Sequence, residues 1–221
     1  MKLGILFSGG KDSTYTAYLA RKEGYELSCL ISVYSGNKES YMFHTPSIKK
    51  TEEQAKLAEI PIITWETEGK KEDELKDLEK AIRLAIREYQ IEGIVTGAIQ
   101  SVYQSSRIQK ICNKLDIECF NPLWLKNEDE YLDELIDNKF KIIITGVFAY
   151  PLDEKWLGKE INSDFVREIK ELNIKYKISI IGEGGEFETI VINCPLFKKP
   201  LKLKSSKDFK EGENSWRREL K

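Results

Sequence analysis

The hexapeptide Ser8-Gly9-Gly10-Lys11-Asp12-Ser13 constrains the fold more than any other stretch of the sequence. An apolar run over residues 2–7 precedes it and predicts a buried strand, and a helical pattern over about 11–23 follows it. The glycines allow a sharp turn with space for a bulky anion, and amide groups at a helix start carry partial positive charge. Two serine hydroxyls and a lysine ammonium add further donors. We therefore expect an anion-binding loop between a strand and a helix.

Spacing separates this loop from other phosphate-binding motifs, since it is neither G-x-x-x-x-G-K-[ST] nor G-x-G-x-x-G. It matches the S-G-G-x-D-S loop of the PP-loop ATPases, and in this respect the chain resembles that family. Those enzymes cleave ATP between its α and β phosphates. The resemblance implies that Lys11 and Asp12 act in catalysis and that ATP is bound by Ser8, Gly9, Gly10, Lys11, Asp12 and Ser13. The alternative is a glycine-rich turn that only caps a helix.

Composition excludes several other classes of protein. The chain has 221 residues, of which 41% are hydrophobic and 33% charged, as in folded domains with a core. Its formal net charge of −2 gives no overall attraction to nucleic acid. No apolar run approaches the roughly 20 residues of a membrane helix, and Met1 leads directly into the first expected strand. We expect a cytoplasmic protein without a signal peptide, whose scattered cysteines are reduced and mostly buried.

Apolar runs alternate with helical patterns along the first part of the chain, which is typical of an α/β fold. The expected strands are 2–7, 27–34, 60–65, 93–97 and 117–120, and the expected helices are 11–23, 47–58, 71–89 and 101–115. This order predicts a parallel five-stranded, Rossmann-like sheet of the HUP or PP-loop type, with helices on both faces. Ligands of such sheets bind beyond the carboxyl ends of the strands. The loop after the fourth strand, which contains Gly97, is therefore expected to join the ATP site.

The rest of the chain predicts a smaller C-terminal α+β domain. Its expected elements are helices at 127–138 and 163–176 and strands at 141–147, 190–193 and 201–203. We expect an ATP-binding domain over 1–122 and a substrate-binding domain over 123–206. A charged tail over 207–221 is expected to be partly ordered at best.

The segment Gly182–Thr189 is the second informative stretch. Three carboxylates, Glu183, Glu186 and Glu188, lie there among three glycines. Glycines let the backbone approach a ligand, and carboxylates bind Mg²⁺, an ammonium ion or a basic substrate group. The alternative is a solvated acidic turn that precedes a strand.

Together these landmarks resemble one subgroup of the PP-loop ATPases, the diphthine–ammonia ligases. The matching pieces span residues 8 to 189: Ser8–Ser13, Met42–Pro46, Gly97–Ser101, Tyr103-Gln104, Arg107, Pro122–Trp124, Trp156–Gly158 and Gly182–Thr189. The first piece is common to the superfamily, and the last is specific to the subgroup. Phe148–Leu152 departs from the pattern, because a small residue and a glycine are expected before the leucine.

This resemblance implies an activity and its partners. Diphthine on translation elongation factor 2 reacts with ammonia and ATP to give diphthamide, AMP and pyrophosphate, through an acyl-adenylate. We expect ATP with Mg²⁺, free ammonium as the nitrogen source, and neither a membrane nor a nucleic-acid partner. Glu183, Glu186 and Glu188 are candidates to bind and deprotonate ammonium, and their individual roles are left open, as are the metal ligands and the formation of a homodimer.

The resemblance also supplies candidate substrate-binding residues: His44, Ser101, Tyr103, Gln104, Arg107 and Thr189. Each of the two most distinctive candidates has an alternative role. His44, the single histidine, is as well explained by a structural position beside a helix start. Arg107 either contacts a phosphate or forms a surface ion pair.

Two other functions compete with the amidation. An enzyme that adenylates a tRNA base would need a basic face and added RNA-binding or zinc-binding segments, which the sequence does not show. In thiolating relatives cysteines carry sulfur, but Cys112 and Cys119 lack redox spacing, which favours packing. A non-catalytic ATP-binding module of the universal-stress type would lack both the S-G-G-x-D-S loop and the acidic segment.

Overall fold

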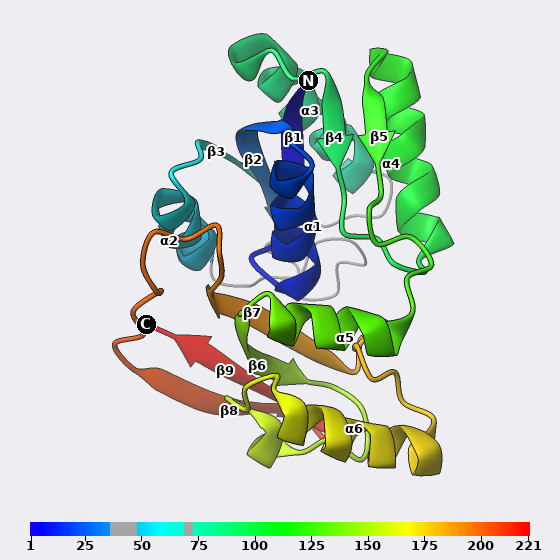
Figure 1. The fold of residues 1–221 in the computed structure, drawn as a ribbon, viewed down its shortest axis with the longest axis vertical. Coiled ribbons are helices and arrows are strands. Elements are labelled where there is room, and N and C mark those ends of the chain that lie inside the picture. Colours follow the sequence, from blue (N-terminus) through cyan, green and yellow to red (C-terminus); the bar gives the residue numbers. More distant parts are fainter. Residues whose placement is uncertain (36–47, 69–72) are drawn as a thin grey trace. The chain divides into compact units, whose positions relative to one another are not determined.

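The computed structural model describes residues 1–35, 48–68 and 73–221. The chain divides into two compact units, Met1–Trp124 and Leu125–Lys221, and each is described by itself (Figure 1).

The first unit is built on a five-stranded parallel sheet with the strand order β3-β2-β1-β4-β5. In chain order the strands are β1 (Lys2–Leu6), β2 (Glu26–Ser35), β3 (Ile62–Thr67), β4 (Gly93–Val95) and β5 (Glu118–Phe120). The central strands β2, β1 and β4 are mostly buried, because parallel strands are covered on both faces. The sequence prediction of a parallel five-stranded Rossmann-like sheet is confirmed.

The helices of this unit lie on both faces of the sheet, as predicted (Figure 1). They are α1 (Lys11–Lys22), α2 (Ile48–Ala58), α3 (Asp73–Tyr89) and α4 (Val102–Leu115). The inner face of α3 contributes Leu78, Ala81, Ile82 and Ala85 to the core, and α4 contributes Ile108, Ile111 and Cys112 to the same cluster. The apolar spacing of three and four residues along α3 explains both its helical form and the face that it buries.

The second unit contains a four-stranded antiparallel sheet with the order β7-β6-β9-β8. Its strands are β6 (Lys141–Val147), β7 (Phe187–Asn193), β8 (Ser206–Gly212) and β9 (Ser215–Leu220). Its helices are α5 (Glu128–Asp137), the short 3₁₀ helix η1 (Glu154–Trp156) and α6 (Ser163–Tyr176). Phe165 of α6 packs edge-on against Trp156 and Phe187, with ring centroids 5.6 and 5.9 Å away, which joins these elements in one core. A C-terminal α+β domain was predicted, and the structure confirms it.

Two sequence predictions in the second unit are wrong. Residues 201–203 form no strand, and the supposed tail over 207–221 lies largely in β8 and β9, which form a hairpin. The charges that suggested disorder pair across the two strands: Arg218 donates to Asp208 at 2.6 Å, and Arg217 to Glu211 at 3.2 Å. Because β9 also pairs with β6, the hairpin completes the sheet.

In the part of the chain that the structure describes, no helix combines the length and the apolar character that crossing a membrane requires.

Candidate functional site

The Ser8–Ser13 loop joins the carboxyl end of β1 to the start of α1. β1 lies between β2 and β4 in the sheet, so the strand order reverses at this point. Open α/β sheets bind their ligands at such a switch point. The loop and the segment after β4, both selected from the sequence, are thus brought to one edge of one sheet.

At Gly97 the segment after β4 lies close to the backbone at the start of α1. A β-carbon built on Gly97 would lie 3.0 Å from two backbone atoms, the carbonyl carbon of Asp12 and the nitrogen of Ser13. Any side chain at this position would therefore push the first turn of α1 away. Gly97 shapes the site by its lack of a side chain rather than by a contact of its own.

The first turn of α1 differs from the first turns of the other capped helices. Its N-cap is Gly10, which has no side chain to accept hydrogen bonds from the helix amides. By contrast α4, α5 and α6 begin at Ser101, Asn127 and Asn162, whose side chains accept bonds from first-turn amides. A helix N-terminus without a side-chain cap presents amide donors and a positive dipole end, which is an anion site.

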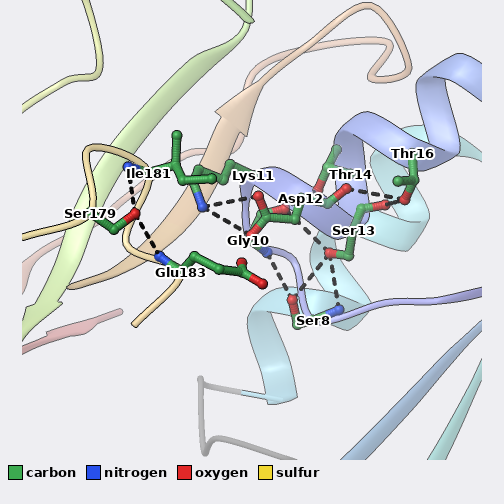
Figure 2. Close-up of polar contacts among 10 residues, drawn as sticks. All are labelled: Ser8, Gly10, Lys11, Asp12, Ser13, Thr14, Thr16, Ser179, Ile181 and Glu183. Carbon is green, nitrogen blue, oxygen red and sulfur yellow. Dashed lines mark hydrogen bonds and ion pairs between the residues drawn. The ribbon is translucent and has the colours of Figure 1, made fainter. Parts of the chain in front are cut away.

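The serine hydroxyls of the loop hydrogen-bond to each other and to the backbone of Gly10 (Figure 2). Ser13 Oγ accepts from the Ser8 amide at 3.2 Å, contacts Ser8 Oγ at 3.1 Å and donates to the Gly10 carbonyl at 3.3 Å. Thr14 Oγ1 donates to the same carbonyl at 2.8 Å. These bonds hold the loop in a fixed turn before any ligand arrives.

Lys11 supplies the cation of the loop, and its exposed fraction is only 5%. Its ammonium lies 2.9 Å from the Asp12 carboxylate, which is more exposed (Figure 2). A paired lysine at the edge of an amide-lined turn suits a polyphosphate, because the ligand can share the ammonium with Asp12.

Residues of α2 support the loop and were not identified from the sequence. Gln54 is fully buried, and its Nε2 donates to the Gly9 carbonyl at 3.0 Å. Thr51 is buried beside it on the same helix. The sequence signal was weak, since a Thr and a Gln three positions apart on a charged helix look like an ordinary solvated face.

The start of α4 contains the next group of candidates. Ser101 is the N-cap of α4, and its Oγ accepts from the Gln104 amide at 3.3 Å. The guanidinium carbon of Arg107 lies 3.4 Å from the centroid of the Tyr103 ring, and Nη1 of Arg107 donates to the Tyr103 carbonyl at 3.4 Å. Ser101 thus has a structural role, and Arg107 is held against a tyrosine face.

The acidic segment is only partly the turn that the sequence suggested, because Glu188 and Thr189 lie within β7. Ser179 organises the turn itself (Figure 2): its Oγ accepts from the amides of Ile181 and Glu183, at 3.3 and 3.2 Å. Its own amide donates to Glu186 Oε1 at 2.8 Å.

The three carboxylates of this segment are in different environments. Glu188 Oε2 accepts from Arg217 at 2.9 Å, so its charge is neutralised within the sheet. Glu186 and Glu188 each have one buried carboxylate oxygen to which no described group donates a hydrogen bond, Glu186 Oε2 and Glu188 Oε1. A buried carboxylate oxygen without a donor is costly unless a ligand completes it. Glu188 is already paired with Arg217, whereas Glu186 Oε1 accepts from a neutral backbone amide, so Glu186 is the better cation ligand of the two.

Two candidates remain, His44 and a metal site. His44 lies outside the described residues. Among residues 1–35, 48–68 and 73–221, no three His, Cys, Asp or Glu side chains are grouped so that they could hold a metal ion. A Mg²⁺ ion held mainly by substrate phosphates needs only one or two carboxylates, and Asp12 in the loop fits that arrangement.

The cysteines are mostly buried, as predicted: Cys29, Cys112 and Cys194 are buried, and Cys119 is half-buried. Cys112 is buried in the core, and its hydrogen bond with Cys119, together with burial, raises the pKa of its thiol. Burial raises the pKa of Cys29 to about 12. All four cysteines are free thiols. Buried protonated thiols do not act as nucleophiles, which supports the packing role of Cys112.

Comparison with known proteins identifies two family models along the chain. The diphthamide synthase N-terminal domain matches residues 1–119, and the diphthamide synthase C-terminal domain matches residues 127–220. The mouse (Mus musculus) protein named diphthine–ammonia ligase is 33% identical over 225 residues, which cover 93% of this chain and 84% of the mouse protein. The human (Homo sapiens) protein of that name is 32% identical with the same coverage.

More distant similarity extends to yeast and to a solved structure. The Saccharomyces cerevisiae diphthine–ammonia ligase is 29% identical over 231 residues, which cover 90% of this chain and 34% of the yeast protein. A Methanocaldococcus jannaschii structure, described as a predicted subunit of tRNA methyltransferase, covers 90% of this chain and 99% of its own. Its TM-score of 0.47 and identity of 22% are too low to carry an argument about substrate.

Proposed function

Because the chain belongs to the diphthamide synthase family, we propose that it catalyses the ATP-dependent amidation of diphthine on translation elongation factor 2. The relatives that cover most of the chain are named diphthine–ammonia ligases. The observation that carries the proposal is the Ser8–Ser13 loop, an uncapped helix start with a lysine at the switch point of the sheet. An amidation driven by ATP needs a site of this kind for the leaving pyrophosphate.

The proposed reaction has two half-reactions. In the first, a diphthine carboxylate oxygen attacks the α-phosphorus of ATP, the bond from that phosphorus to the bridging oxygen breaks, and pyrophosphate leaves. In the second, ammonia attacks the acyl carbon of the adenylate, AMP leaves with the carbon–oxygen electron pair, and a base takes the extra proton. Adenylation is required because a free carboxylate is a poor acyl donor.

The loop serves the first half-reaction. Negative charge develops on the bridging oxygen as pyrophosphate departs, and amides fixed at the start of α1 stabilise it without reorganising. The ammonium of Lys11 adds a mobile positive charge beside them. We propose that Asp12 orients Lys11 and, with phosphate oxygens, holds Mg²⁺, which would screen the charge between the phosphates.

The acidic segment serves the second half-reaction. We propose that Glu186 binds ammonium and accepts its proton, because one of its carboxylate oxygens is buried without a described donor and the other accepts from a neutral amide rather than from an arginine. Glu188, which the sequence left as an equal candidate, is assigned instead to holding Arg217. Glu183 and Thr189 remain proposed contacts to ammonium and substrate.

The start of α4 is proposed to contact the substrates of the first half-reaction. Ser101 orients the first turn of α4, and Tyr103, Gln104 and Arg107 lie within that turn and the next. Stacking on the Tyr103 ring fixes the plane of the Arg107 guanidinium, which suits recognition of a carboxylate or phosphate. His44 is retained as a proposed substrate contact.

One experiment tests the proposal directly. The protein is incubated with elongation factor 2 that carries diphthine, together with ATP, Mg²⁺ and ammonium chloride. Mass spectrometry of the modified peptide should show conversion of the carboxylate to the amide, and chromatography should show AMP and pyrophosphate in equal amounts. An unchanged peptide, or ADP with phosphate as products, would contradict the proposal. A parallel incubation with bulk tRNA should give no adenylated or tightly bound RNA.

A further inference from the structure

Helix α2 presents buried polar side chains where a helix usually presents apolar ones. The exposed fractions of Lys50, Thr51 and Gln54 are 6%, 2% and 0%. A buried amide is expected to hydrogen-bond, and Gln54 does so through Nε2 to the Gly9 carbonyl, 45 residues earlier in the chain. Gln54 therefore links α2 to the Ser8–Ser13 loop rather than to the apolar core.

Gln54 and Gly9 also fit each other in shape. Gly9 has a φ of +78°, in the left-handed region that other residues rarely adopt. A β-carbon built on Gly9 would lie 2.2 Å from Gln54 Oε1 and 3.3 Å from Thr51 Cγ2. The amide of Gln54 thus fills the space that a side chain at residue 9 would occupy.

The hydrogen bond from Gln54 fixes the direction of the next amide group. In a planar trans peptide the carbonyl and the N–H point in opposite directions. Because Gln54 holds the Gly9 carbonyl toward α2, the Gly10 N–H points away from α2. Within residues 1–35, 48–68 and 73–221, that N–H makes only a long contact of 3.4 Å, with Ser8 Oγ, so it retains capacity to donate to a stronger acceptor.

A peptide between two glycines turns over easily, because neither residue has a β-carbon to restrict its dihedral angles. We propose that Gln54 is a positioning residue for the loop: it prevents rotation of the Gly9–Gly10 peptide and keeps the Gly10 N–H directed at the pyrophosphate of ATP. This inference rests on the proposed function of the loop. It adds α2 to the site as the element that sets the geometry of the loop for pyrophosphate.

The test uses full-length Gln54→Met, which keeps a long side chain but removes the donor. We expect the Kd for inorganic pyrophosphate, measured calorimetrically, to rise about tenfold, because one fixed amide donor is lost. The Kd for adenosine should change less than twofold, since the nucleoside does not use the loop amides. In ATP–pyrophosphate exchange the KM for pyrophosphate should rise with it.

Controls separate this positioning role from simple packing. Gln109→Met removes a glutamine whose Nε2 bonds Asn113 at 2.8 Å on the exposed face of α4, and it should leave both affinities unchanged. Gln54→Asn, which keeps the amide but is one methylene too short, provides a second variant if Gln54→Met fails to fold. It should show the same selective loss.

Two results would overturn the inference. The first is pyrophosphate affinity within twofold of wild type in a folded Gln54 variant. The second is an equal loss of adenosine affinity, which would indicate a general packing defect. The proposed function fails separately: if the wild type binds pyrophosphate and the variants lose it, but diphthine is never amidated, Gln54 keeps its role and the reaction is wrong.

Discussion

The Ser8–Ser13 loop and the Gly182–Thr189 segment are both short, polar and glycine-containing, but they present opposite chemistry. In the loop, side-chain hydroxyls bond to one another and to the Gly10 carbonyl, and the start of α1 receives no side-chain cap. In the acidic segment, Ser179 Oγ accepts from the amides of Ile181 and Glu183. Buried carboxylate oxygens of Glu186 and Glu188 have no described hydrogen-bond donor. One region thus presents donors for an anion, and the other presents acceptors for a cation.

In the proposed mechanism, this difference suits the two regions to different chemical steps. Departure of pyrophosphate needs donors, and delivery of ammonia needs a negatively charged acceptor. The two regions also belong to separate compact units, so each can be changed without altering the internal packing of the other. Variants in one region should therefore affect one half-reaction.

The largest expected effect on activity comes from a substitution in the Ser8–Ser13 loop, the region that presents donors. Lys11→Ala removes the cation beside the leaving group and should lower ATP–pyrophosphate exchange and amidation together by about 10²–10³-fold, as for loss of one preorganised charge donor. The measurement is exchange of labelled pyrophosphate into ATP with diphthine-bearing factor present. Lys22→Ala, at the far end of α1, is the matched control and should behave as wild type. Near-normal exchange in Lys11→Ala would remove the lysine from the first half-reaction.

The next largest effect on activity is expected from a substitution in the Gly182–Thr189 segment, the region that presents acceptors. Glu186→Gln keeps the size of the side chain but removes its charge and its basicity. We expect pyrophosphate exchange within about threefold of wild type and amide formation reduced by about 10²-fold or more, the usual contribution of a general base. The loss should be steepest at low ammonium concentration. If amidation at low ammonium is normal, the acidic segment has a structural role only.

How far the sequence predicted these regions depends on the range of the interactions involved. The loop was identified from six adjacent residues, because its geometry is set locally by a strand end, two glycines and a helix start. The hydrogen bond from Gln54 to the Gly9 carbonyl was missed because it spans 45 positions. The different environments of Glu186 and Glu188 were missed for the same reason, since Arg217 lies 29 positions from its partner.

In the fold, too, features set within one element were predicted, and features set by pairing between elements were not. The parallel sheet was predicted because each strand and helix carries its own periodic pattern. The hairpin of β8 and β9 was mistaken for a tail, because its strands are charged and only cross-strand pairing shows how Asp208 and Arg218 neutralise each other. Periodic patterns within each element therefore predicted the parallel sheet, whereas the hairpin depends on ion pairs between two strands that such patterns do not reveal.

A smaller effect is expected on the free energy of unfolding when Arg217, the partner of Glu188, is removed. Arg217 bridges Glu188 and Glu211, and its side chain is 23% exposed. Arg217→Ala should lower the free energy of unfolding by about 1 kcal/mol, more than an exposed pair and less than a fully buried one. This corresponds to a fall of about 2–4 °C in Tm for a chain of this size. Arg167→Ala, which breaks an exposed pair with Asp164, is the control. It should shift Tm by roughly 1 °C or less, because exposed ion pairs contribute little to stability.

The same variant sharpens the comparison between the regions. Pyrophosphate exchange should remain close to wild type in Arg217→Ala, because the Ser8–Ser13 loop belongs to the other unit. A loss of exchange as large as that expected for Lys11→Ala would show that the two regions do not act separately.

The smallest expected effect is the pH dependence of the hairpin. Arg218 donates to both carboxylate oxygens of Asp208, at 2.6 and 2.7 Å, and this pairing lowers the pKa of Asp208 below its ordinary value. A carboxyl whose pKa is lower in the folded state stabilises the fold above its unfolded pKa, and that contribution is lost as the pH falls through the folded value.

Asp208→Asn should therefore be less stable than wild type at pH 7, and the difference should shrink once the pH falls below about 3.9, the ordinary aspartate pKa. Because the Asp208 side chain is 43% exposed, solvent screening limits the difference at neutral pH to about 0.5 kcal/mol. Urea unfolding of both proteins across this pH range provides the measurement. A difference that stays constant to low pH would mean that Asp208 stabilises the hairpin through packing or hydrogen bonding that the asparagine also loses, and not through its charge.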